Sequence, residues 1–330
     1  MENTKITIIG TGSWGIALAV SFHNAGKNVT LWGRRAEYTK ELRALRCSAY
    51  LPNIAIASTL PITSDSSDIE ESDIVLWVVP VQESLKQLHT LKAHIPKHCP
   101  IIICSKGLEL NTQQPLSELF KSYLPNPIGI LSGPNFADEI AKGLPAASTL
   151  AFEDLDLAKK TSQILRHKSF RIYAHDDLVG IGLAAALKNV IAIGAGIVIG
   201  KELGKNCLAA LITRATIEIS RLICTFGGKK ETMQTLAGIG DLLLTCSSAE
   251  SRNTSLGIAL AQGLALEDIL NSRKSVTEGV PTTKVAFELA QLHKIHAPII
   301  CAVYEILYEK KSIDDVIFLL LSNQNDSEFE

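Results

Sequence analysis

ITIIGTGSWG, residues 6–15, is the stretch that decides the fold of the N-terminal part of the chain. Its isoleucines suit a short buried strand, its last six residues match G-x-G-x-x-G, and an amphipathic stretch over 16–25 follows. Gly10 permits a tight turn, Gly12 lets a pyrophosphate approach the backbone, and Gly15 lets helix and strand pack closely. Because strand, motif and helix occur in this order, the sequence predicts dinucleotide binding in preference to an ordinary Gly-rich turn.

Length and composition predict how many domains the chain has, and which partners and which compartment it is suited to. The chain has 330 residues, 46% of them hydrophobic, which predicts two domains with sizeable cores. A net charge of −2 without a basic block argues against a nucleic acid or a membrane surface as a partner. The seven cysteines show no C-x-x-C spacing, which indicates reduced thiols. The first predicted strand begins so early in the chain that we expect no signal peptide before it. We therefore expect a cytoplasmic protein.

One segment, Leu178–Gly200, is apolar and long enough to span a bilayer, and it contains a G-x-x-x-G pattern. However, Lys188 and Asn189 lie at its centre, where a charge is costly in lipid, and no second span exists. The sequence therefore favours a buried helix of a soluble domain, with Lys188 facing a cleft, and no integral membrane segment.

The second predicted strand, residues 28–32, ends in Gly33-Arg34-Arg35. Folds that prefer NAD place an acidic residue here, on the ribose 2′-hydroxyl. Two arginines suit a 2′-phosphate instead, through charge and paired donors. NADP(H) is therefore the preferred cofactor. NAD(H) remains open, because an arginine can also stack on adenine, and the pair could simply open the next helix in solvent.

Further apolar runs continue the alternation of strands and helices. Strands are expected over 73–79, 100–104 and 128–131, with a helix over 81–93, which predicts a parallel sheet. Ligands of such sheets lie beyond the carboxyl ends of the strands. Lys106 and the turn Gly133–Ala137 follow two of these ends and are candidate site residues, although a lysine alone is more often a surface residue.

Pro134 is expected in the first turn of a helix that runs through Ile140. Strands over 146–151 and 170–173 then complete the first domain. The fold class is α/β: a Rossmann-type parallel-sheet domain over 1–176, and an all-α-helical domain over 177–330 in which the alternation stops. The histidine pairs lack a cluster of Cys or carboxylate residues, so no metal site is expected. The tail from Ser322 is polar and expected to fray.

The second domain offers the groups that a ketone reduction requires. A lysine in an apolar helix has a lowered pKa and can supply a proton, which suits Lys188. Asp241 is the best candidate to hold its ammonium group, although the two could also be a structural pair between helices. Ser251-Arg252-Asn253 could bind a phosphate, or could be an ordinary loop or helix cap.

Several segments together resemble the bacterial type of NAD(P)-dependent glycerol-3-phosphate dehydrogenase. They are, in order, GTGSWG, SKG, LSGPNFA, ALKN, AGIGDLLLTC, SRN and TEG, and they extend from Ile6 to Glu278. AGIGDLLLTC followed by SRN is the most specific part. The family usually has Ser or Thr after Gly-Pro, whereas this chain has Asn135.

The resemblance implies a role for each matching residue. Lys188 is the proton donor or acceptor, and Lys106 lies between cofactor and substrate. The residues implied to bind substrate are Lys106, Gly133, Asn135, Asn189, Asp241, Thr245, Ser251, Arg252 and Asn253. The residues expected to bind cofactor, from the motif and the resemblance, are Gly10, Gly12, Ser13, Trp14, Arg34, Arg35, Lys106, Ala137, Arg252, Val276 and Glu278.

The resemblance thus implies an oxidoreductase that interconverts dihydroxyacetone phosphate and sn-glycerol 3-phosphate for glycerophospholipid synthesis. Its partner is a small phosphate substrate, and a homodimer is one expected assembly. Two alternatives remain open. A related β-hydroxyacid dehydrogenase would bind a carboxylate, and a non-catalytic NADP(H) sensor would need no proton donor.

Overall fold

The computed structural model describes residues 4–273 and 276–322, so the tail predicted to fray lies almost entirely outside the described residues. The chain divides into two compact units. The first comprises Met1–Ser105 and Leu116–Leu178, and the second comprises Lys106–Pro115 and Val179–Glu330. The predicted domain boundary lies after residue 176, whereas the second unit begins at Val179 and also takes in the segment 106–115.

The first unit is built on one eight-stranded sheet. Its strand order is β3-β2-β1-β4-β5-β6-β7-β8. The strands are β1 (Ile6–Ile9), β2 (Val29–Trp32), β3 (Ile62–Thr63), β4 (Ile74–Trp77), β5 (Ile101–Ile103), β6 (Ile128–Ser132), β7 (Ala146–Ala151) and β8 (Phe170–His175). Neighbouring strands are parallel except β6 and β7, which pair antiparallel with Ile130 opposite Ala151. The sheet is therefore mostly parallel, which confirms the predicted parallel-sheet domain, and the antiparallel pair of β6 and β7 is a feature that was not predicted.

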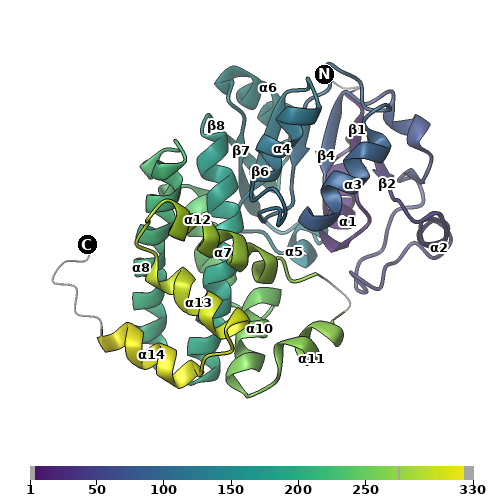
Figure 1. Cartoon of the computed structure of the whole chain (residues 1–330). Helices are drawn as coiled ribbons and strands as arrows, with labels where there is room; N and C mark the ends of the chain where they lie inside the picture. The colour runs from purple at the N-terminus through teal and green to yellow at the C-terminus, as the bar shows by residue number, and fades with distance from the viewer. Residues whose placement is uncertain (1–3, 274–275, 323–330) are drawn as a thin grey trace. The chain divides into compact units, whose positions relative to one another are not determined.

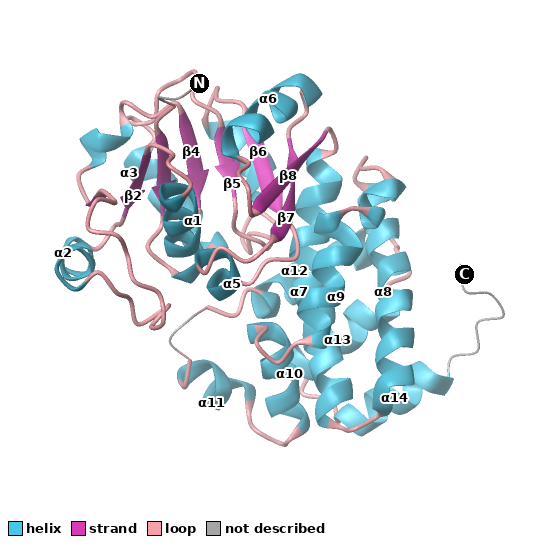
Figure 2. Cartoon of the chain, turned by 180° about the vertical axis from the view of Figure 1, so that it is seen from behind, coloured by secondary structure: helices cyan, strands magenta, loops and turns pink. Residues whose placement is uncertain are grey.

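Helices cover both faces of this sheet, as alternating strands and helices require. They are α1 (Ser13–Asn24), α2 (Ala36–Leu45), α3 (Val81–Leu91), α4 (Leu116–Tyr123), α5 (Ala137–Ala141) and α6 (Leu155–Leu165), with a 3₁₀ turn η1 (Ser66–Ile69). Figure 1 shows α3 and α4 in front of the strands, and Figure 2, seen from behind, shows α1 in front of them. β1, β2 and β4 are buried throughout, and their side chains form the core with one face of α1.

The turn from β1 into α1 has the geometry that its glycines predict. Gly10 has a φ of 130°, a region that side chains disfavour. A Cβ atom on Gly15 would lie 1.9 Å from the carbonyl oxygen of Gly10. Any larger residue at position 15 would therefore push the helix away from the turn.

The turn after β6 differs from the prediction. α5 begins at Ala137, so Pro134 lies outside the helix that it was expected to open. The loop lies against β7 instead: a Cβ atom on Gly133 would be 2.8 Å from Cα of Ser148. Phe136 is extended, with φ −90° and ψ 138°, and the chain turns helical only after it.

The second unit is helical. Its helices are α7 (Leu178–Gly200), α8 (Gly204–Thr225), α9 (Asp241–Ser247), α10 (Arg252–Ala261), α11 (Leu266–Asn271), α12 (Gly279–Leu292), α13 (Pro298–Tyr308) and α14 (Ile313–Ser322). A 3₁₀ turn, η2 (Lys230–Gln234), and a π turn, η3 (Leu236–Gly240), precede α9. α14 was not predicted.

α7 is the central helix of this unit (Figure 2). Among the described residues it is the one helix long and apolar enough to cross a membrane, yet 94% of its apolar window is buried inside the structure. Its G-x-x-x-G pattern packs against α10. A Cβ atom on Gly196 would lie 2.0 Å from the carbonyl oxygen of Thr254, and one on Gly257 would lie 2.0 Å from that of Ile193. The two backbones thus touch directly, as in a buried helix pair.

Candidate functional site

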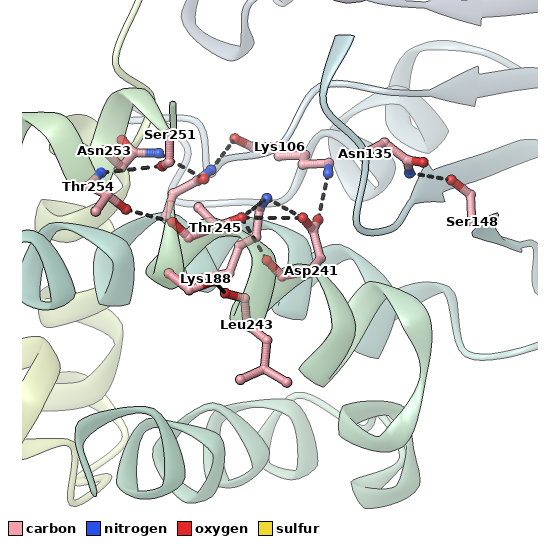
Figure 3. Close-up of polar contacts among 12 residues, drawn as sticks. Lys106, Asn135, Ser148, Lys188, Asp241, Leu243, Thr245, Ser251, Asn253 and Thr254 are labelled. Atoms are coloured by element: carbon pink, nitrogen blue, oxygen red, sulfur yellow. Dashed lines mark hydrogen bonds and ion pairs between the residues drawn. The ribbon is translucent and has the colours of Figure 1, made fainter. Parts of the chain in front are cut away.

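The ammonium group of Lys188 is held by the residues at the start of α9. Its Nζ atom lies 2.5 Å from Oδ1 of Asp241 and 2.7 Å from Oγ1 of Thr245 (Figure 3). All three residues are buried, with exposed fractions of 6%, 1% and 5%. The ion pair expected between Lys188 and Asp241 is therefore present, and it joins α7 to α9.

Lys106 contributes a second ammonium group to the same carboxylate. Its Nζ atom lies 2.5 Å from Oδ2 of Asp241, so each carboxylate oxygen faces one lysine. The side chain of Lys106 is 18% exposed, against 8% for Lys188. The candidate cluster is thus Lys106, Lys188, Asp241 and Thr245, and all four residues belong to the second unit.

Burial and charge set the proton affinities in this cluster. Burial lowers the pKa of Lys188 to about 8, and the nearby Lys106 also lowers it, against the opposing effect of Asp241. Burial alone would raise the pKa of Asp241, but the two lysines outweigh it and hold that pKa below the ordinary value. An anionic Asp241 beside a lysine that can lose its proton near neutral pH is an arrangement suited to proton transfer.

The local sequence explains how Asp241 is presented. Thr235 begins the π turn, and its hydroxyl oxygen accepts a hydrogen bond from the Gly238 backbone N–H at 3.2 Å. A Cβ atom on Gly238 would lie 2.5 Å from the carbonyl oxygen of Met233, so the turn requires glycine. Asp241 then occupies the first residue of α9, where helix N–H groups favour a carboxylate.

A chain of amide contacts fixes the segments around the cluster. Nδ2 of Asn189 donates to the carbonyl oxygen of Lys106 at 3.1 Å. Oδ1 of Asn189 accepts from Nδ2 of Asn253 at 2.9 Å, and Oδ1 of Asn253 accepts from the Gly279 backbone N–H at 3.1 Å. These bonds tie α7, α10 and α12 to the segment that carries Lys106. Asn189 and Asn253 therefore hold segments of the second unit together, in addition to any role toward a ligand.

Ser251 and Arg252 stand at the start of α10. Oγ of Ser251 accepts from the Thr254 backbone N–H at 3.3 Å, so Ser251 is the helix cap that was one of the expected alternatives. Nη1 of Arg252 donates to the carbonyl oxygen of Val276 at 2.8 Å. Glu278, which follows that segment, lies close enough to favour the charged form of Arg252. The predicted residues 252, 276 and 278 are thus brought together.

Arg273 is a neighbour that sequence reasoning missed. Its guanidinium group donates to the carbonyl oxygen of Arg252 at 2.5 Å and to Oγ of Ser255 at 3.0 Å. These contacts hold the first turn of α10. No sequence signal marks Arg273, because its partners are a backbone carbonyl and a common hydroxyl.

In the first unit, the start of α1 is open to a ligand. No side chain caps its first turn, and a Cβ atom on Gly12 would meet nothing within 4 Å. Ser13 and Trp14 are the first two residues of the helix. The Nε1 atom of Trp14 is buried and has no hydrogen-bond partner among the described residues. Buried donors are rarely left unpaired, so this atom is suited to a ligand.

Arg34 and Arg35 follow β2. Nη1 of Arg34 lies 2.9 Å from Oε2 of Glu83, and both side chains are about half exposed, at 53% and 48%. Ion pairs on the surface contribute little free energy, so a ligand could readily take the place of Glu83 beside Arg34. Arg35 stacks on the ring of Tyr38, with 4.7 Å from Cζ to the centroid, and Nη2 donates to the hydroxyl of Tyr50 at 3.3 Å.

Asn135 lies in the loop between β6 and α5, after Gly133 and before Ala137, the first residue of α5. Its Nδ2 atom donates to Oγ of Ser148 in β7 at 2.7 Å (Figure 3). Its Oδ1 atom is buried and has no hydrogen-bond partner within residues 4–273 and 276–322. Ser148 was not a predicted site residue, and a buried serine in a strand carries no local signal.

Two models of one protein family match most of the chain. The family models described as NAD-dependent glycerol-3-phosphate dehydrogenase N-terminus and C-terminus match residues 5–158 and 177–318. The chain is 46% identical over 317 residues to the glycerol-3-phosphate dehydrogenase (NAD(P)+) of Gluconobacter oxydans strain 621H, covering 96% of each chain. It is 40% identical over 323 residues to that of Maricaulis maris strain MCS10, covering 97% of each.

A solved structure is similar over the same length. The crystal structure of glycerol-3-phosphate dehydrogenase from Coxiella burnetii matches with a TM-score of 0.93 and 35% identity. The match covers 98% of this chain and 100% of that one. Family models, relatives and structure therefore agree along nearly the whole sequence. The chain belongs to the NAD(P)-dependent glycerol-3-phosphate dehydrogenase family and is an oxidoreductase.

Proposed function

We propose that the chain reduces dihydroxyacetone phosphate to sn-glycerol 3-phosphate, with Lys188 as the proton donor, and so feeds glycerophospholipid synthesis. The observation that carries this proposal is the buried cluster in which Asp241 pairs with Lys188 at 2.5 Å. We assign dinucleotide binding to the domain over 1–176, and substrate binding and catalysis to the domain over 177–330. A non-catalytic sensor would have no use for a buried lysine with a lowered pKa.

The first unit fits a dinucleotide cofactor. The uncapped start of α1, the open space at Gly12 and the unpaired Nε1 atom of Trp14 all support this fit. When bound, a reduced nicotinamide cofactor supplies a hydride to C2 of the ketone. The residues proposed to hold it are Gly10, Gly12, Ser13, Trp14, Arg34, Arg35, Lys106, Ala137, Arg252, Val276 and Glu278.

Lys188 delivers the proton that the substrate oxygen takes up during reduction. Asp241 keeps the ammonium group in place, and Thr245 accepts a hydrogen bond from it. Arg252 binds the phosphate of the substrate, because its guanidinium group can form paired, charge-assisted hydrogen bonds. The other residues proposed to contact the substrate are Lys106, Gly133, Asn135, Asn189, Ser251 and Asn253.

A steady-state assay with dihydroxyacetone phosphate and each reduced cofactor tests the proposal. We expect turnover with the phosphate substrate and little with a β-ketoacid of similar size. Turnover of the ketoacid alone would favour a β-hydroxyacid dehydrogenase. No turnover of either substrate would favour the sensor.

We propose that NADPH is preferred to NADH because Arg34 and Arg35 replace the usual acidic residue. The double variant Arg34→Ala/Arg35→Ala should raise KM for NADPH by about 10-fold or more, from the loss of charge-assisted hydrogen bonds, and change KM for NADH little. Arg43 lies in α2, the helix that begins directly after Arg35, so Arg43→Ala is the control for the loss of a positive charge from this region. Equal effects of the double variant on both cofactors would show that these arginines do not recognise the 2′-phosphate.

The pH dependence of kcat/KM for reduction should be opposite to that for oxidation. Lys188 must be protonated for reduction and neutral for oxidation, and its pKa is lowered to about 8. As pH rises through this value, kcat/KM should fall for dihydroxyacetone phosphate and rise for sn-glycerol 3-phosphate. Initial rates in both directions between pH 6 and about 10 measure this. Profiles that move in the same direction would remove Lys188 from the proton transfer.

We also propose a cytoplasmic homodimer. Each of the seven cysteines is free, which agrees with a reducing compartment. Sedimentation velocity of the purified chain tests the assembly.

A further inference from the structure

The segment that carries Lys106, residues 106–115, forms a closed loop around the carboxylate of Glu109, and we call it the lysine loop. Oε2 of Glu109 accepts hydrogen bonds from the backbone N–H and the hydroxyl of Thr112, at 2.7 and 2.8 Å, and Oε1 accepts one from Nδ2 of Asn111 at 3.0 Å. Burial alone would raise the pKa of Glu109, but these hydrogen bonds outweigh it and hold that pKa below its ordinary value. Glu109 is only 3% exposed, so its negative charge is stabilised inside the loop.

The backbone closes the same loop. The N–H of Glu109 donates to the carbonyl oxygen of Gln114, and the N–H of Gln113 donates to the carbonyl oxygen of Glu109, both at 3.0 Å. Leu108 and Pro115 face each other as an antiparallel bridge. The ends of the lysine loop thus lie together, and Glu109 joins its first half to its second through both its side chain and its backbone.

The lysine loop is attached to a helix of its own unit. Leu108 is fully buried in the core of the second unit, and its backbone N–H donates to Oγ1 of Thr282 in α12 at 3.4 Å. Nε2 of Gln113 donates to Oε2 of Glu288, also in α12, at 2.7 Å. Because the backbone is tied to α12 on both sides of Glu109, the loop can hold the lysine that precedes it in a fixed position.

The ammonium group of Lys106 contributes to the charge around Lys188. Both lysines bind the carboxylate of Asp241, each at 2.5 Å (Figure 3). Burial lowers the pKa of Lys188 most, and the positive charge of Lys106 lowers it further, whereas Asp241 raises it. The thiol of Cys246 in α9 also interacts with Lys188, but burial raises the pKa of Cys246 to about 12, so the thiol stays neutral. Moving Lys106 away would therefore raise the pKa of Lys188.

We propose that Glu109 is a positioning residue: it closes the lysine loop, holds the ammonium group of Lys106 against Asp241, and so decides at which pH Lys188 gives up its proton. This inference rests on the proposed function, in which Lys188 is the proton donor. It adds to that function a residue that acts through the loop and not through contact with a ligand. Lys106 then takes part in the proton transfer through its charge, in addition to any contact that it makes with the substrate.

Glu109→Gln tests the positioning role. Glutamine keeps the shape of the side chain, but its amide nitrogen can only donate, so the side chain cannot accept hydrogen bonds at both ends. The midpoint of the pH profile of kcat/KM for dihydroxyacetone phosphate should move upward by about one pH unit, because Lys188 loses a neighbouring positive charge. Lys106→Met should move the midpoint in the same direction by at least as much. In the Lys106→Met background, Glu109→Gln should cause no further shift.

Glu218→Gln is the matched control. Glu218 is also a buried glutamate of the second unit, 2% exposed, and its carboxylate accepts hydrogen bonds from the backbone N–H groups of Ile299 and Ile300. The variant therefore disturbs the same kind of hydrogen bonds, between α8 and α13 and outside the lysine loop. It should lower the melting temperature and leave the midpoint of the pH profile unchanged.

Gln113→Ala is a second and milder variant of the lysine loop, and it keeps the inference testable if Glu109→Gln does not fold. It removes the contact with Glu288 and leaves the carboxylate of Glu109 in place. The midpoint should move upward again, by less than in Glu109→Gln. Titration of isotope-labelled lysine by NMR measures the pKa of Lys188 in every variant without turnover.

Two results would overturn the inference. One is a lower melting temperature in Glu109→Gln or Gln113→Ala with an unchanged midpoint, which would mean that the loop only supports the fold. The other is an undiminished shift by Glu109→Gln in the Lys106→Met background, because Glu109 would then act on Lys188 without Lys106. Failure of the proposed function would appear separately, as a wild-type chain that does not turn over dihydroxyacetone phosphate although NMR still reports the titration of Lys188.

Discussion

Lys188→Met should lower kcat for dihydroxyacetone phosphate by about 10²–10⁴-fold, the range typical of a lost general acid. Methionine is close to lysine in length, so it preserves the packing of α7 while removing the proton. Asp241 would keep its ion pair with Lys106, so the carboxylate would not be left alone. Single-turnover reduction measures the effect on the chemical step, and fluorescence titration should show little change in NADPH affinity.

Lys188→Arg separates proton transfer from charge. Arginine keeps a cation beside Asp241 but does not give up a proton at neutral pH. This variant should therefore be nearly as slow as Lys188→Met, although its charge is preserved. A variant with near-normal kcat would contradict the assignment and would transfer the acid role to Lys106. A loss of thermal stability with kcat retained would instead indicate a structural pair between α7 and α9.

Arg252→Ala should lower kcat/KM for dihydroxyacetone phosphate by a factor equivalent to about 3–5 kcal/mol, from the loss of two charge-assisted hydrogen bonds. The hydrogen bond to Val276 uses one N–H of the guanidinium group, which has five. Binding at the phosphate also orients the ketone, so kcat should fall together with the rise in KM. Steady-state kinetics at saturating NADPH measures both.

Dihydroxyacetone, which lacks the phosphate, is the control substrate for Arg252. Its kcat/KM should change far less in Arg252→Ala. Arg273→Ala, in contrast, removes a support of the first turn of α10 and should have a smaller effect on the natural substrate. Equal losses of Arg252→Ala with both substrates would indicate a structural role or a role toward the cofactor alone.

The sequence predicted the parts of the fold that local patterns determine. The strand, turn and helix around Gly10 are present, and α7 has the bounds Leu178–Gly200 that its apolar run predicts. The pairing of Lys188 with Asp241 was also predicted, because a buried ammonium group requires a counterion. The roles of the site residues toward substrate and cofactor stay predictions.

The features that the sequence did not predict depend on distant partners. The apolar run of β7 carries no information about strand direction, so its antiparallel pairing with β6 could not be predicted. The segment 106–115 belongs to the second unit through contacts such as Gln113 with Glu288, at 2.7 Å. Ser148 was missed for the same reason, since its partner Asn135 comes from a separate loop.

The contact between Gly196 and Gly257 has a consequence for how this enzyme can change. α7 carries Lys188 and α10 begins at Arg252, and the two helices meet backbone to backbone. A smaller residue than glycine does not exist, and a larger one would force the helices apart. With Lys188 as the proton donor and Arg252 as the phosphate ligand, this contact between α7 and α10 fixes the distance between the two groups. Adaptation to a longer phosphate ester would therefore begin at these two glycines, which need not touch the substrate at all.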